Sequence, residues 1–278
     1  MLIKLIKYDI RADYKKYMIT AAVILLLSLA VRLADIKFGN LDNGSDWKLL
    51  FEFLAVALII LCGVALLMTL IISAVRYQKK MYSDEGYLMN TLPIHPVLHI
   101  LSSILTTCIW TVFIAAVDLL ALIIAAGGMA FWEGFFTPFV YLWNFDRIFA
   151  FNTFGYLILT PVTKMLTLIF TINFGYLFRS HRIVAGIGGY VGLCIISQIL
   201  TSIIYFLLGK ANVNAKISGI FTENPNYFSS SESYQRVIGE LAKLSEGSYL
   251  PALIANVILF SALFIISVYI LKKKINLD

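Results

Sequence analysis

Residues 183–209, IVAGIGGYVGLCIISQILTSIIYFLLG, contain no charged side chain. A helix needs about 20 mostly apolar residues to cross the hydrocarbon layer of a membrane, so this stretch is long enough to span it once. Five more stretches have the same character, which gives six predicted spans at about 17–34, 51–75, 100–126, 148–178, 183–209 and 250–271. Only 14% of the residues are charged, whereas soluble domains carry about 25%. The sequence therefore predicts an all-α polytopic membrane protein with six transmembrane helices.

Lysine and arginine are unevenly distributed among the segments that connect the predicted spans. They are denser in 1–16, 76–99, 179–182 and 272–278 than in 35–50, 127–147 and 210–249. Because cytoplasmic loops carry the excess of basic residues, both ends of the chain are predicted to lie in the cytoplasm. No connecting segment exceeds about 40 residues, which is near the lower limit for a domain that folds alone. We therefore expect a single transmembrane domain over 1–278, with 210–249 as an extracellular loop.

Residues 1–16 predict a helix that lies in the membrane surface. Two stripes recur there at intervals of three or four residues: an apolar one of Ile3, Ile6, Ile10, Tyr14 and Tyr17, and a basic one of Lys4, Lys7, Arg11 and Lys15. The apolar stripe suits the acyl boundary, and the basic stripe suits the lipid phosphates. The alternative is an ordinary basic flank that only sets the orientation of the first span.

The predicted cytoplasmic segment 76–99 is longer than a connection between two helices needs to be. Within it, residues 82–93 read Tyr-Ser-Asp-Glu-Gly-Tyr-Leu-Met-Asn-Thr-Leu-Pro. Ser83 is suited to cap a short helix with Asp84 and Glu85 in its first turn, and Pro93 would end that helix. The segment is therefore a candidate handle for a soluble partner.

This run resembles the Asp-Glu-Gly-Tyr-Leu-x-x-Thr-Leu-Pro segment of the six-span ABC-2-type permeases of Firmicutes. The opening Lys7-Tyr8-Asp9-Ile10-Arg11, with its Lys-Tyr-Asp-x-Arg pattern, is similar to that family as well. The resemblance implies an ABC-2 (type V exporter-like) architecture in a bacterial cell membrane. It also implies that the N-terminal helix and the segment after the second span contact a separate ATPase. The coupling residues would be Tyr82, Ser83, Asp84, Glu85, Gly86, Tyr87 and Leu88.

The sequence lacks the Gly-x-x-x-x-Gly-Lys-Ser/Thr loop that cradles nucleotide phosphates, so ATP-driven work would require another chain. By the resemblance, two ATPase subunits holding ATP and magnesium would drive two permease subunits, in a homodimer or a heterodimer. The substrate class that fits the apolar walls best is amphipathic, such as a peptide, a lipid or a drug. A non-transport receptor or assembly factor that recruits a cytosolic partner is the alternative.

Two ionisable residues lie deep within predicted spans, Asp118 in the third and Lys164 in the fourth. At about 1.5 Å per residue their backbones differ in height by roughly 6 Å, which the Lys stem can bridge. Charges at membrane depth are costly enough to require partners. Four interpretations remain open: a structural Asp118–Lys164 pair, a polar transport path, outward snorkelling of the side chains, and a span boundary that lies elsewhere than predicted.

Gly188 and Gly192 have the Gly-x-x-x-Gly spacing that allows membrane helices to approach closely, either within one subunit or between two. In the predicted extracellular segments, the aromatic-rich stretch 131–151 suits the interfacial belt, and 210–249 is expected to hold a small helix.

No residue set predicts catalysis or a cofactor in this chain. His95 and His99 have a chelating spacing, but Pro96 separates them and no third ligand is near, so we expect no metal. The basic residues are too scattered to indicate nucleic acid, and membrane lipid is the expected surrounding. An intramembrane enzyme would have to rely on Asp118 and Lys164 alone.

Overall fold

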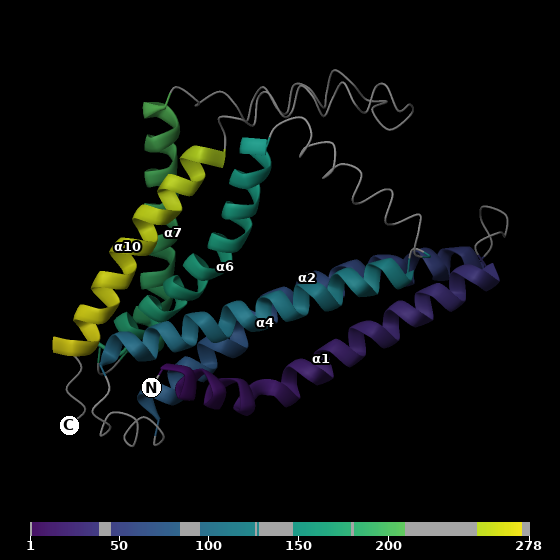
Figure 1. The fold of residues 1–278 in the computed structure, drawn as a ribbon, viewed down its shortest axis with the longest axis horizontal. Coiled ribbons are helices and arrows are strands. Elements are labelled where there is room, and N and C mark those ends of the chain that lie inside the picture. Colours follow the sequence, from purple (N-terminus) through teal and green to yellow (C-terminus); the bar gives the residue numbers. More distant parts are fainter. Residues whose placement is uncertain are drawn as a thin grey trace. The chain divides into compact units, whose positions relative to one another are not determined.

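The computed structural model is all-helical, with six helices among the residues it describes, which are 2–38, 46–83, 95–125, 127, 147–178, 181–208 and 249–273 (Figure 1). The helices are α1 (Leu2–Phe38), α2 (Asp46–Tyr82), α4 (Pro96–Ala125), α6 (Arg147–Gly175), α7 (Arg182–Leu207) and α10 (Tyr249–Lys273). They form two compact units, Met1–Phe135 with α1, α2 and α4, and Phe136–Asn276 with α6, α7 and α10.

Five of these helices are long and apolar enough to span a membrane: α1, α2, α4, α7 and α10. The fourth predicted span falls on α6, where several side chains lie outside the described residues. Many large apolar side chains face outward, such as Leu26, Val112 and Phe206, and this amount of exposed apolar surface suits lipid rather than water. The chain is thus a multi-pass membrane protein, as its composition predicts.

In the first unit, α1 runs antiparallel to α2 and parallel to α4. The register is visible in Tyr17, whose hydroxyl donates to the carbonyl of Thr69 on α2 at 3.2 Å. The Tyr17 ring stacks on Trp110 of α4 with centroids 4.1 Å apart. Ile24 and Leu58 continue the same apolar core, which packs the three helices together along their lengths.

The N-terminal segment differs from its prediction in two respects. Residues 2–38 form one continuous helix, so no break separates the segment 1–16 from the first span. The same segment also packs against the rest of the unit through a second face, on which Leu5, Asp9 and Asp13 are buried, whereas Ile3 of the predicted apolar stripe is 80% exposed. The physical reason is that acidic residues of α1 find basic partners on α2. A surface location for this segment stays a prediction.

In the second unit, α6 and α7 approach each other closely at glycines. A Cβ atom added to Gly175 would lie 2.7 Å from the Arg182 carbonyl oxygen and 3.3 Å from the Gly186 Cα. A Cβ added to Gly188 or Gly192 would meet no described atom within 4 Å. The close approach therefore uses Gly175 and Gly186, and the role of the Gly188–Gly192 pair in packing stays a prediction.

The two kinds of glycine can be compared by alanine substitution. Gly175→Ala should destabilise the protein by about 1–3 kcal/mol, because the added methyl group collides with backbone atoms that cannot easily move. Gly188→Ala is the matched control and should be neutral or slightly stabilising, because alanine is the better helix former. Thermal unfolding of the full-length protein in detergent measures both. Equal unfolding temperatures for the two variants would contradict the packing described here.

Candidate functional site

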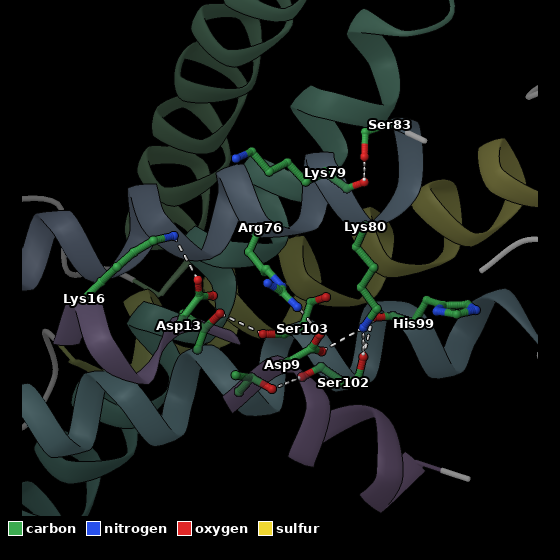
Figure 2. Close-up of polar contacts among 12 residues, drawn as sticks. Asp9, Asp13, Lys16, Arg76, Lys79, Lys80, Ser83, His99, Ser102 and Ser103 are labelled. Carbon is green, nitrogen blue, oxygen red and sulfur yellow. Dashed lines mark hydrogen bonds and ion pairs between the residues drawn. The ribbon is translucent and has the colours of Figure 1, made fainter. Parts of the chain in front are cut away.

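Four charged residues meet at one end of the first unit, and we call them the charged cluster: Asp9 and Asp13 of α1, and Arg76 and Lys80 of α2 (Figure 2). Each pair is spaced by one helical turn, so both acids share one face of α1 and both bases share one face of α2. Because α1 and α2 are antiparallel, the two faces meet. The cluster contains two acids and two bases and is electrically balanced.

Lys80 lies at the centre of the charged cluster. Its Nζ donates to Asp9 Oδ2 at 2.7 Å and to Ser102 Oγ of α4 at 2.8 Å. The Ser102 hydroxyl in turn donates to the His99 carbonyl at 3.0 Å. Only 1% of Lys80 and 2% of Asp9 is exposed. This short, charge-assisted contact joins all three helices of the unit at a single ammonium group.

Arg76 completes the charge balance at a longer distance. Its Nε lies 3.8 Å from Asp9 Oδ1, and its guanidinium covers the ring of Tyr8 at 5.1 Å. Asp13 is held by Lys16 of the same helix at 3.0 Å. A cavity of about 10 Å³, close to the size of one water molecule, lies between Asp9, Asp13 and Arg76.

The surroundings of the charged cluster are polar on one side and aromatic on the other. His99 is buried behind Lys80, and its Nδ1 has no hydrogen-bond partner among the described residues. On the other side, the Tyr17 hydroxyl lies 3.3 Å from Ser73 Oγ. In the described ranges no three His, Cys, Asp or Glu side chains gather as metal ligands would. The ion pairs and hydrogen bonds of the charged cluster hold α1, α2 and α4 in register.

The charged cluster directly precedes the segment that the sequence singles out. Tyr82 is the last residue of α2, and the Ser83 hydroxyl donates to the Lys79 carbonyl, closing the helix end. The coupling residues Asp84, Glu85, Gly86, Tyr87 and Leu88 lie outside the described residues. Their predicted role therefore stays a prediction, as do those of the stretches 131–151 and 210–249, which fall largely outside the description as well.

Asp118 and Lys164 lie in different units. Asp118 is buried on α4, close to the Cys62 thiol of α2. Neither of its carboxylate oxygens has a hydrogen-bond partner among the described residues. Lys164 is exposed on α6 and lines a polar cavity of the second unit. Their predicted pairing is not tested by either unit and stays a prediction.

Sequence reasoning assigned Arg76 and Lys80 to the basic residues that set orientation, and it did not connect Asp9 with Lys80. A usable signal was present, since Asp9 and Asp13 share a helical face, as do Arg76 and Lys80. Two complementary faces with one-turn spacing on neighbouring helices favour a pairing between them.

No protein family, curated protein or solved structure matches this chain.

The Asp9–Lys80 pair makes a direct prediction about stability. Lys80→Met should cost about 3–5 kcal/mol, because it leaves the Asp9 carboxylate buried without its partner. The double variant with Asp9→Asn should recover much of that loss. Lys79→Met is the matched control, since its exposed side chain points away from the charged cluster (Figure 2). Unfolding of the wild type, the two single variants Lys80→Met and Asp9→Asn, and the double variant in detergent forms a double-mutant cycle, and additive effects would refute the pair.

Proposed function

We propose that the chain is the membrane-spanning permease subunit of an ATP-driven transporter, powered by a separate ATPase that contacts residues 82–93. The observation that carries the proposal is the position of Lys80, two residues before the segment that resembles the ABC-2 coupling loop. Lys80 forms an ion pair with Asp9 in the N-terminal part of α1. The resemblance implies that this part of α1 also contacts the ATPase.

The charged cluster gives this proposal a mechanical basis. A force applied to residues 82–93 would enter α2 at Tyr82, two residues after Lys80, whose ammonium group binds Asp9 of α1 and Ser102 of α4. Buried charged contacts resist separation, because breaking them exposes an unpaired charge to a low-dielectric interior. The three helices of the first unit would therefore move as one body when the ATPase subunits close.

The proposal includes the finer features predicted from the sequence: six spans, both chain ends in the cytoplasm, and a surface position for residues 1–16. The shallow groove along the start of α1 supports the last feature, since Ile3, Ile10 and Tyr14 line it together with Lys7 and Arg11. Such a mixed apolar and basic surface suits the membrane interface. The exported substrate would be amphipathic, and a second permease subunit would complete the pathway.

The coupling role can be tested by substitution at Glu85 and Gly86. Each alanine variant should lower the stimulation of the partner's ATP turnover at least fivefold or so, as expected when an interface residue worth more than about 1 kcal/mol is lost. The assay compares the ATPase that co-purifies with the chain, with and without the chain in lipid vesicles. Glu52→Ala is the control, since Glu52 is exposed at the predicted opposite side of the membrane.

Two results of this experiment would contradict the proposal. The first is an ATP turnover that the wild-type chain leaves unchanged. The second is a co-purifying cytosolic partner that hydrolyses no ATP, which would favour the receptor or assembly factor. If the Glu85→Ala and Glu52→Ala variants stimulated ATP turnover equally, only the coupling role of residues 82–93 would be refuted, and not the transporter function as a whole.

A further inference from the structure

The second unit contains a polar cavity at the depth of its membrane-spanning helices. Its volume is about 210 Å³, and its polar wall is formed by three helices: Thr163 and Lys164 of α6, Tyr190, Ser197 and Gln198 of α7, and Asn256 of α10. Lys164 lies 11 residues before the end of α6 at Gly175, or about 16 Å along the helix. Such a set of polar groups inside apolar helices marks a functional site more often than a packing contact.

Lys164 is the charge that defines this cavity. The described lining includes no aspartate or glutamate, and Lys164 forms no ion pair within the described part of the second unit. An ammonium group at membrane depth is costly unless an anion accompanies it. The cavity therefore suits a ligand that carries a negative charge.

The hydroxyl groups around Lys164 restrict the ligand further. Thr163 donates to the Leu159 carbonyl at 2.9 Å, and Ser197 donates to the Cys194 carbonyl at 2.8 Å. Thr167 likewise donates to the Thr163 carbonyl at 2.8 Å. The Thr163 hydroxyl also lies 3.2 Å from Asn256 Oδ1, which can accept the same proton. Because these protons point to carbonyl or amide oxygens of the protein, the hydroxyl oxygens that line the cavity are left as acceptors. Donors to an anion come instead from the Lys164 ammonium and the Gln198 amide.

The complement of this wall is a compact group that combines an anion with hydroxyl donors. The cavity is smaller than the 300–1,000 Å³ or so that whole drug-sized ligands occupy, so it suits a headgroup rather than a complete amphipathic molecule. We propose that it binds a glycerophosphate group, with Lys164 and Gln198 on the phosphate and the threonine and serine oxygens on the glycerol hydroxyls. This inference rests on the proposed function, because the cavity would bind the polar headgroup of the transported amphipathic substrate.

Binding can be measured on the full-length chain without any ATPase, in phosphatidylcholine nanodiscs titrated with phosphatidylglycerol. A ligand that binds only the folded protein raises its unfolding temperature, so the midpoint reports the affinity. Lys164→Gln should weaken binding about tenfold or more, as expected for the loss of a hydrogen bond to a charged group. Gln198→Leu should weaken it less. Lys272→Gln is the matched control, because it removes an exposed charge of α10 outside the cavity.

The source of the group is separated by a second titration with soluble glycerol phosphate. Stabilisation by phosphatidylglycerol alone supports a lipid ligand, and stabilisation by both probes, lost in Lys164→Gln, supports glycerophosphate recognition from either source. Equal affinity of wild-type and Lys164→Gln for phosphatidylglycerol would overturn the proposal. A second pattern would also overturn it: Lys164→Gln is less stable without lipid, Asp118→Asn restores that stability, and the affinity for phosphatidylglycerol is unchanged. Lys164 would then form an ion pair with Asp118 and would not bind a ligand. The binding measurement uses no ATP and no ATPase. A negative result would therefore refute the glycerophosphate site without affecting the outcome of the coupling experiment.

Discussion

The Lys80 ammonium is held between a carboxylate of α1 and a hydroxyl of α4, and the arrangement of the first unit depends on this contact. In a membrane protein, apolar side chains give little preference for one helix neighbour over another, because lipid is equally apolar. A buried charge pair is different, since any other register would leave both ions unpaired. The Asp9–Lys80 contact therefore fixes which helices meet and at which height. The stacked pair of Tyr17 and Trp110 continues that register along the unit.

The two units use buried polar groups in opposite ways. In the first unit the cluster charges are balanced and lie within a few ångströms of one another, which favours a rigid body. In the second unit Lys164 faces a cavity whose described lining offers no acid, which favours a ligand. Under the function we propose, the first unit would transmit force and the second would contact the substrate. The coupling and binding experiments examine the two parts separately.

The helices could be predicted from the sequence more readily than their contacts. Each predicted span falls on an observed helix, because apolar length is a local property that the chain displays directly, although α1 and α2 extend well beyond the spans 17–34 and 51–75. The burial of Lys80 could not be predicted from its local sequence, because it depends on Asp9, which lies 71 residues away along the chain. Basic residues near span ends usually mark orientation, and this rule concealed the pairing. Similarly, the Gly-x-x-x-Gly spacing points to Gly188, whereas the observed close approach of α6 and α7 occurs at Gly175 and Gly186.

We propose that residues 82–93 face the cytoplasm, directly after the end of α2 that the charged cluster ties to α1. The most direct test is side-specific labelling of Glu85→Cys in a chain whose Cys62, Cys108 and Cys194 are replaced by alanine. A membrane-impermeant maleimide should label this cysteine in inside-out membrane vesicles and leave it unlabelled in intact cells. Labelling in intact cells would place the segment on the outer face and contradict the account.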